Sequence, residues 1–163
     1  MSTEQYVLII DDQVGEILWL LDLLAHRGYE VHVVDNEKDG NAILDAIHRD
    51  ETSYVAAIFD VMVSTLSIEE IIETQTKLDD QFFEDSKDTG IRLCHRVREL
   101  GLNLPVACLT VREDDDIQEM SANLEIPVYH RIPKDESQSI QGFLDEHLPP
   151  LPDSKAARAP STD

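Results

Sequence analysis

Apolar residues along the chain alternate between short continuous runs and stripes with helical spacing. Two runs, Tyr6–Ile10 and Val55–Phe59, consist of apolar residues throughout, which is typical of strands buried on both faces of a parallel sheet. Residues Glu30–Val34 predict a further short strand, and two more are predicted over Leu104–Thr110 and Pro127–Ile132. The pattern therefore predicts five strands.

The residues between these strands carry apolar positions three and four apart, which indicates helices. The first helix is predicted to stop near Gly28, because glycine commonly ends a helix. Later helices are predicted over 37–49, 91–100, 114–124 and 137–147. Strict alternation of strands and helices predicts an α/β fold with a doubly wound five-stranded parallel sheet. Ligands of such sheets bind beyond the carboxyl ends of the strands.

The stretch between Asp60 and Gly90 is much longer than the about two to six residues that usually follow a strand. Residues 64–89, here called the acidic segment, hold eight acidic residues and two lysines. Ser67 precedes two glutamates and a run of helically spaced apolar residues, which predicts the N-cap of an amphipathic helix. Two interpretations stay open: a solvated decoration, or a lid or partner-docking element beside Asp60.

Length and composition predict one domain over residues 1–148, because 163 residues suit a single hydrophobic core. From Pro149 the chain becomes rich in proline and polar residues and loses its apolar periodicity. We expect this tail, residues 149–163, to be disordered. Cys94 and Cys108 lie inside apolar segments and are expected to be buried free thiols.

The chain is strongly acidic, with 13 basic and 34 acidic side chains and a net charge of −21. Such a surface repels nucleic-acid backbones and anionic lipid, so neither nucleic acid nor a membrane is an expected partner. The sequence shows no N-terminal targeting signal and no run near the about 18 apolar residues of a membrane span. These features predict a cytoplasmic protein.

Three acidic residues follow or close the apolar strands. Asp11 and Asp12 follow the first strand, and Asp60 closes the one predicted after the second helix. Parallel strands end at one edge of a sheet, so these carboxylates are expected to converge there. Their mutual repulsion is offset most simply by a hard divalent cation with oxygen ligands. Mg²⁺, which needs few protein ligands, is the predicted ion, with Mn²⁺ as an alternative.

Thr110 and Lys134 follow the last two predicted strands, at the same edge of the sheet. An oxygen of Asp60 could there attack a phosphoryl group in line. The cation, the Lys134 ammonium and the Thr110 hydroxyl would neutralise or hydrogen-bond the transferred oxygens. A phosphohydrolase of the haloacid dehalogenase type also uses a strand-end aspartate and Mg²⁺. Its general acid stands two residues after the nucleophile, where this chain has Met62.

The order Asp-Asp, Asp, Thr, Lys at four strand ends resembles the receiver domain of two-component response regulators, over about residues 5–148. The resemblance implies a flavodoxin-like sheet with strand order 2-1-3-4-5, in which the acidic segment is inserted between the third strand and the third helix. It also implies a role for each residue at the edge. Asp60 would be the phosphoacceptor, Asp11, Asp12, Asp60 and the backbone carbonyl of Met62 the Mg²⁺ ligands, Thr110 the switch hydroxyl and Lys134 its partner.

The chain departs from the family pattern at several positions. Val111 stands where a small residue normally follows the threonine. The glycine that usually comes eight positions after the phosphoacceptor appears only at Gly90. Lys134 is preceded by a proline and followed by Asp135, where the family has proline after the lysine.

The function implied by the resemblance is a phosphoacceptor switch in a two-component phosphorelay. A histidine kinase or histidine phosphotransfer domain would supply the phosphoryl group, and phosphorylation of Asp60 would alter a surface that binds a downstream protein. The protein would then be no enzyme beyond its own phosphorylation and dephosphorylation. The alternative is an adaptor of the same fold that binds a protein partner independently of phosphorylation.

Overall fold

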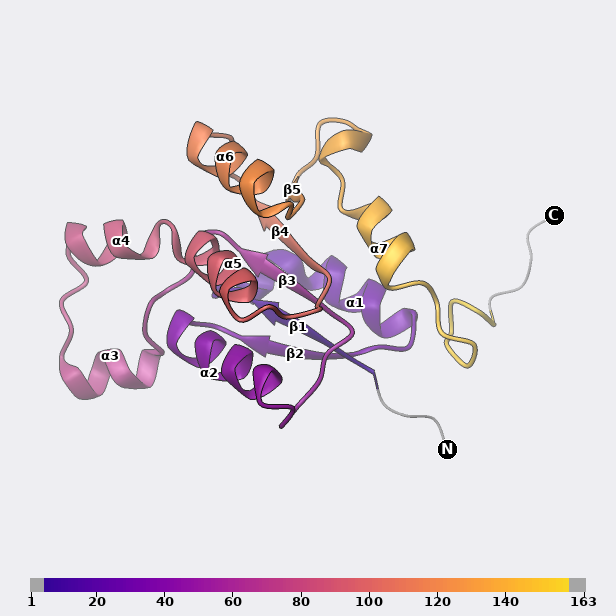
Figure 1. Cartoon of the computed structure of the whole chain (residues 1–163), viewed down its shortest axis with the longest axis horizontal. Coiled ribbons are helices and arrows are strands. Elements are labelled where there is room, and N and C mark those ends of the chain that lie inside the picture. The colour runs from indigo at the N-terminus through magenta and orange to yellow at the C-terminus, as the bar shows by residue number, and fades with distance from the viewer. Residues whose placement is uncertain (1–4, 159–163) are drawn as a thin grey trace.

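A computed structural model, which describes residues 5–158, contains one sheet of five parallel strands in the order β2-β1-β3-β4-β5 (Figure 1). The predicted α/β class and strand order are therefore confirmed. The first two strands span the predicted residues, the third is shifted by one residue, and the last two are shorter than predicted. The strands are β1 Tyr6–Ile10, β2 Glu30–Val34, β3 Ala56–Asp60, β4 Val106–Thr110 and β5 Val128–His130.

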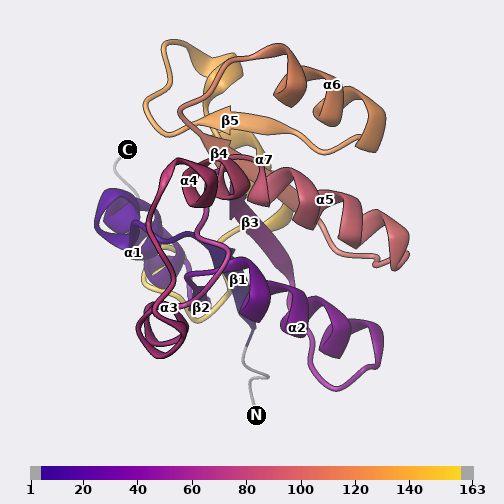
Figure 2. The ribbon, with the colours of Figure 1, turned by 90° about the vertical axis from the view of Figure 1, so that its left-hand side faces the viewer.

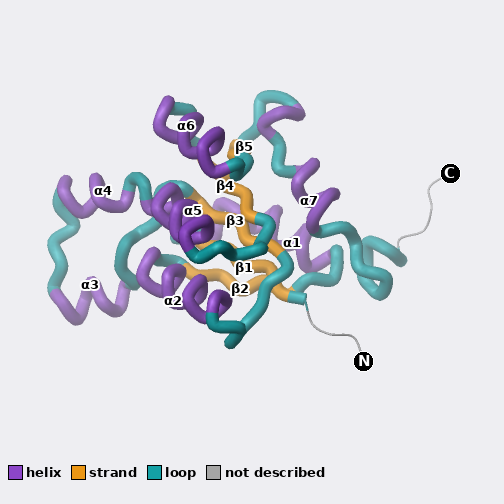
Figure 3. Tube along the Cα trace, viewed as in Figure 1, coloured by secondary structure: helices purple, strands orange, loops and turns teal. Residues whose placement is uncertain are grey.

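Helices alternate with these strands and cover both faces of the sheet (Figure 3). The α-helices are α1 Leu18–His26, α2 Glu37–His48, α3 Ile68–Thr74, α4 Asp80–Ser86, α5 Thr89–Glu99, α6 Asp115–Leu124 and α7 Gln141–His147. Two 3-10 turns, η1 Val14–Ile17 and η2 Glu136–Gln138, precede α1 and α7. The first helix ends before Gly28, as predicted, and the φ of +97° at this glycine explains the choice of residue.

The sheet separates two apolar layers. Helices α2, α5 and α6 pack on one face, and α1 and α7 pack on the other (Figures 1 and 2). Leu44 and Leu93 are fully buried in the first layer, and Leu20 and Leu144 in the second. Because both faces are covered, β3 and β4 are buried along their whole length. The continuous apolar runs of the sequence have this physical origin.

The parallel register brings the carboxyl ends of four strands to one edge. Ile10 of β1 pairs with Phe59 of β3, and Asp60 pairs with Leu109 of β4. Thr110, the last residue of β4, pairs with His130, the last residue of β5. The residues that end these strands, and those directly after them, therefore lie side by side.

The acidic segment leaves the body of the domain after β3 and returns at α5. Its helices α3 and α4 lie beyond the carboxyl edge of the sheet (Figure 1). The predicted cap is present, since the Ser67 hydroxyl accepts a hydrogen bond from the Glu70 N–H. The segment forms two short helices and not one, because Gln75 adopts a left-handed conformation that ends α3. The Thr89 hydroxyl donates to the Val63 carbonyl over 2.6 Å and joins the two ends of the excursion.

Residues 149–158, part of the tail whose composition predicts disorder, lie against the body of the domain. The Leu151 N–H donates to the Arg27 carbonyl over 2.9 Å, and the Ala156 N–H donates to the His26 carbonyl over 3.0 Å. The free carbonyls at the end of α1 thus provide partners that composition alone does not reveal. Ser154 is buried. Residues 159–163, the rest of the predicted tail, lie outside the described residues.

Two further sequence expectations concern the cysteines and membrane spans. Cys94 and Cys108 are free and buried, as predicted, with their Sγ atoms 3.3 Å apart between α5 and β4. Among residues 5–158, no helix combines the length and the apolar character that crossing a bilayer requires.

Candidate functional site

The structure brings the three acidic residues of the strand ends together. One carboxylate oxygen from each of Asp11, Asp12 and Asp60 lies within 4.8 Å of the others. Asp11 follows β1 and is 2% exposed, and Asp60 ends β3 and is 6% exposed. Asp12 is exposed. The parallel register of β1 and β3 places these side chains at the same height, which explains their convergence.

Each carboxylate also accepts a hydrogen bond from one backbone N–H group. These bonds orient the carboxylates, because the donors belong to the loops that follow β1 and β3. The Gln13 N–H donates to Asp11 Oδ1 (2.7 Å), the Ser64 N–H to Asp12 Oδ2 (3.0 Å) and the Met62 N–H to Asp60 Oδ1 (3.3 Å).

Asp11, Asp12 and Asp60 are here called the acid cluster, and Arg131 supplies a positive charge in direct contact with it. Its Nη2 donates to Asp11 Oδ2 over 2.8 Å and to Asp60 Oδ2 over 2.5 Å. Its Nη1 pairs with Glu16 and lies 3.4 Å from the side-chain oxygen of Gln13. The Arg131 side chain is only 7% exposed. The guanidinium thus bridges two of the three carboxylates.

Lys134, the residue that the sequence pattern places at this edge, does not contact Asp60. Its side chain is 77% exposed, and its ammonium group lies 3.7 Å from Glu113. The difference has a simple cause, because β5 ends at His130 and not at Ile132. Arg131 is therefore the first residue beyond the strand, and Lys134 lies further along the loop toward η2. A charged residue inside a predicted buried strand was the signal that could have identified Arg131.

The pKa values of all three carboxyl groups of the acid cluster are raised. Burial, with a contribution from Asp11, raises the pKa of Asp60 to about 7, although Arg131 and the Met62 N–H oppose the rise. Burial likewise raises the pKa of Asp11 and the pKa of Asp12 above their usual range. A second positive charge, in addition to Arg131, placed among these three carboxyl groups would favour their ionised forms.

The donor set of the acid cluster fits a hard divalent cation. All of its donors are carboxylate oxygens, and Mg²⁺ or Mn²⁺ takes a small number of such ligands together with water. Asp11, Asp12 and Asp60 are the residues that would hold the ion. The role of the Met62 backbone carbonyl stays a prediction; its N–H donates to Asp60.

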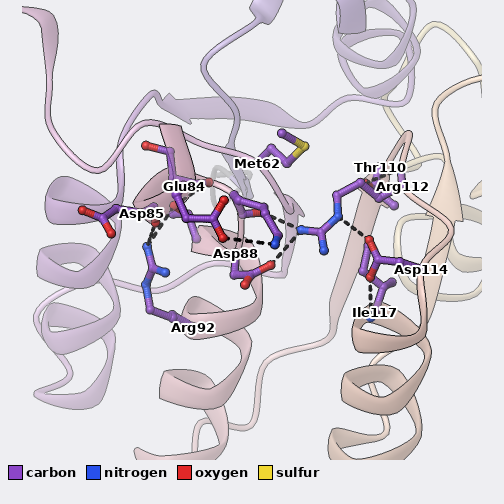
Figure 4. Close-up of polar contacts among 12 residues, drawn as sticks. Met62, Glu84, Asp85, Asp88, Arg92, Thr110, Arg112, Asp114 and Ile117 are labelled. Atoms are coloured by element: carbon purple, nitrogen blue, oxygen red, sulfur yellow. Dashed lines mark hydrogen bonds and ion pairs between the residues drawn. The ribbon is translucent and has the colours of Figure 1, made fainter. Parts of the chain in front are cut away.

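Thr110 is buried at the end of β4, and its Oγ1 accepts a hydrogen bond of 3.0 Å from the Arg112 N–H. The Arg112 guanidinium joins two other elements, as Figure 4 shows. It donates to the Lys87 carbonyl (2.7 Å) and to Asp88 (2.8 Å), and its Nε donates to Asp114 at the start of α6 (2.7 Å). The loop that carries Thr110 is thus connected to the end of the acidic segment.

A cleft of about 490 Å³ opens beside the acid cluster. Asp60 and Arg131 line one part of it, and Phe82 and Phe83 of α4 line another. Val111, which follows Thr110, also lines the cleft, and its side chain is largely exposed. The acidic segment therefore provides one wall of the space next to Asp60.

Comparisons with known proteins identify the fold. No protein-family model matches the chain, and no curated protein matches it. Among solved structures, a putative response regulator from Chloroflexus aurantiacus matches at a TM-score of 0.59 and 21% identity, over 90% of this chain and 98% of that one. A response regulator receiver domain protein from Methanospirillum hungatei matches at a TM-score of 0.58 and 18% identity, over 89% and 97% of the two chains.

A third structure shows a metal at its own site. It is the receiver domain of a sensor histidine kinase from Pseudomonas aeruginosa, with a magnesium ion coordinated in its active-site cleft. It matches at a TM-score of 0.56 and 17% identity, over 89% of this chain and 98% of that one. At these identities the likeness concerns the fold. The chain has the fold of response regulator receiver domains.

Proposed function

We propose that this protein is a phosphoacceptor switch of a two-component phosphorelay. The observation that carries the proposal is the position of Asp60, at the end of the central strand β3, with the carboxylates of Asp11 and Asp12 close enough to share a cation. The receiver fold supports it, and so does the magnesium ion in the cleft of the similar Pseudomonas aeruginosa domain.

The reaction would be an in-line transfer from a phosphohistidine to Asp60. A carboxylate oxygen of Asp60 forms a bond to phosphorus as the P–N bond of the donor breaks, and the imidazole keeps the electron pair and takes a proton from solvent. Bound Mg²⁺ would supply charge neutralisation for the transferred oxygens and favour the ionised form of Asp60. Beside the cation, the Thr110 hydroxyl is a donor that this chain offers to these oxygens. The role predicted for the Lys134 ammonium, which lies beside Glu113 in the structure, stays a prediction.

The output would be a change in a protein-binding surface. A phosphoryl group on Asp60 adds negative charge and three acceptor oxygens, which would draw Thr110 toward it. The Arg112 N–H holds the Thr110 hydroxyl, and the Arg112 guanidinium holds Asp88 and Asp114. Movement of Thr110 would therefore reach the acidic segment and α6, which are the surfaces that we propose for the downstream protein.

The proposal extends to the partners and location of the protein. The donor is a histidine kinase or a histidine phosphotransfer domain, and the downstream partner is a protein. The protein acts in the cytoplasm and has no enzymatic activity beyond its own phosphorylation and dephosphorylation. The net charge of −21 supports an output through a protein and not through nucleic acid.

The decisive experiment is intact-mass measurement after incubation with acetyl phosphate, with and without Mg²⁺. We expect the gain of one phosphoryl group only with Mg²⁺, and no gain in the Asp60→Asn variant. Asp85→Asn, an exposed acid of the acidic segment, is a matched control that should be phosphorylated like the wild type. No gain from acetyl phosphate or from a phosphorylated histidine phosphotransfer domain would contradict the proposal and favour the phosphorylation-independent adaptor.

A further inference from the structure

We propose that Arg131 is a resident counter-ion of the acid cluster, and that a divalent cation binds only by displacing its guanidinium from Asp11 and Asp60. The inference rests on the proposed function, because it concerns the same acid cluster. It adds a competition between a side chain of the protein and the metal, which would set the concentration of Mg²⁺ that the switch requires.

The competition follows from the oxygens that Arg131 uses. Of the two oxygens of Asp11, one accepts from the Gln13 N–H and the other from Arg131 Nη2. The two oxygens of Asp60 likewise accept one hydrogen bond each, from the Met62 N–H and from Arg131 Nη2. A cation that binds both carboxylates would lie beside the Arg131 guanidinium, and the repulsion between the two positive charges in this buried site favours displacement of the guanidinium. The two bonds to Arg131 are the ones that a rotation of one side chain releases.

Partners that the displaced guanidinium could keep are already in contact with it. Arg131 Nη1 pairs with Glu16, whose side chain is largely exposed, and lies near the side-chain oxygen of Gln13. The guanidinium can turn away from the acid cluster and keep these partners. Its Nε is buried without a hydrogen-bond partner among the described residues, so the contact with the cluster leaves one donor unsatisfied. An unpaired buried donor makes the displacement easier.

Other positive side chains close to the site are engaged elsewhere. The Lys134 ammonium is exposed and faces Glu113, and the Arg112 guanidinium is held by Asp88 and Asp114. Within residues 5–158, Arg131 is the cationic side chain paired with Asp11 and Asp60. Its burial strengthens both ion pairs, because little water screens them.

Calorimetric titration of the unphosphorylated full chain with Mg²⁺ tests this inference. We expect Arg131→Gln to lower the Kd for Mg²⁺ by about tenfold or more, because the loss of a buried ion pair frees both carboxylates. Arg131→Lys keeps the charge but lacks the planar fork that bridges two carboxylates. Its Kd for Mg²⁺ should therefore lie between those of the wild type and Arg131→Gln. Lys134→Gln removes one positive charge from the same loop and should leave the Kd within about twofold of the wild type.

The outcomes separate this inference from the proposed function. An equal or higher Kd in Arg131→Gln than in the wild type would overturn the displacement and leave the metal site in place. Absence of Mg²⁺ binding in all variants would overturn both. If Arg131→Gln does not fold, Arg131→Lys provides the test. An unchanged Kd for Mg²⁺ in Arg131→Lys would contradict a competition between Arg131 and the cation. The NMR signal of the Arg131 Nε–H in the wild type should shift along the Mg²⁺ titration, and a constant signal would also overturn the inference.

Discussion

Gly90 lies so close to the backbone of Asp60 that a Cβ atom at this glycine would be 2.2 Å from the Asp60 carbonyl oxygen and 2.6 Å from the Val61 Cα. The Gly90 N–H donates to the Val61 carbonyl over 2.8 Å. The start of α5 is thus fixed against the end of β3, although the acidic segment separates them in sequence. Only glycine allows this approach, and the approach fixes the backbone beside Asp60.

Gly90→Ala should therefore destabilise the protein by about 2–4 kcal/mol, since backbone atoms and not flexible side chains meet the new methyl group. Urea unfolding followed by circular dichroism measures the difference. Gly142→Ala in α7 is the matched control, because no atom lies within 4 Å of its Cβ position. Equal stabilities of the two variants would show that the backbone can move apart at Gly90 without loss.

Asp60→Asn should stabilise the metal-free protein at neutral and higher pH. Folding raises the pKa of Asp60 from 3.8 to about 7, chiefly through burial, so the folded state holds the proton more tightly than the unfolded state. Stability of the wild type therefore falls as pH rises between these two values, and the variant avoids the loss. We expect a gain on the order of 1–3 kcal/mol above pH about 7, because the lost ion pair with Arg131 offsets part of the shift.

Thermal unfolding in EDTA across this pH range tests the sign, and the gain should vanish below pH about 4. Asp145→Asn is an informative control with the opposite expectation. The Arg27 guanidinium lowers the pKa of Asp145, so this replacement should slightly destabilise the protein at neutral pH. A Tm difference between Asp60→Asn and the wild type that does not depend on pH would contradict a raised pKa of Asp60 in the folded state.

The sequence predicts the convergence of the carboxylates better than it predicts which basic side chain contacts them. Asp11 and Asp60 follow directly from two apolar runs, because a strand buried on both faces must end where polar residues begin. The choice between Arg131 and Lys134 depends on the last residue of a three-residue strand. Ile132 continues the apolar pattern beyond Arg131, so the sequence does not mark this strand end. The order of residues alone therefore favours the lysine, and only the register of β5 reveals the arginine.

The acidic segment and the tail show a second limit. Ser67 correctly predicts the start of α3, but nothing in the apolar spacing marks Gln75 as its end. The left-handed conformation there depends on how the segment folds back. The packing of residues 149–158 depends on carbonyl groups of α1, which are distant in sequence. Long-range hydrogen bonds of this kind leave no local pattern.

Deletion of residues 66–87 should raise the rate of phosphorylation by acetyl phosphate, because Phe82 and Phe83 line the cleft next to Asp60. The ends of the excursion already touch through Thr89 and Val63, so a short connection can close the chain. We expect a rise of about three- to tenfold if the segment acts as a lid. A double variant, Phe82→Ala with Phe83→Ala, keeps the segment and should show part of the effect. An unchanged rate in both would rule out gating.

Arg112→Gln should loosen the link between the Thr110 loop and the acidic segment. The guanidinium holds the Lys87 carbonyl and Asp88, and these contacts are lost in the variant. Faster amide hydrogen exchange is expected in α4, together with a loss of about 1–3 kcal/mol in the free energy of unfolding. Arg49→Gln, which removes an exposed pair with Glu51, should change neither quantity. Unchanged exchange in α4 would argue against a connection through Arg112.

Truncation after Leu148 should destabilise the domain, although the removed residues were expected to be disordered. The Tyr29 hydroxyl loses its bond to the Pro149 carbonyl, and the Arg27 carbonyl loses the Leu151 N–H. Gly28 is then uncovered, since Leu151 and Ser154 lie against it. These losses predict a decrease of about 1–3 kcal/mol, measured by urea unfolding. A chain that ends at Arg158 keeps all of these contacts and is the matched control. Equal stability of the two truncated chains would show that residues 149–158 contribute nothing to the fold.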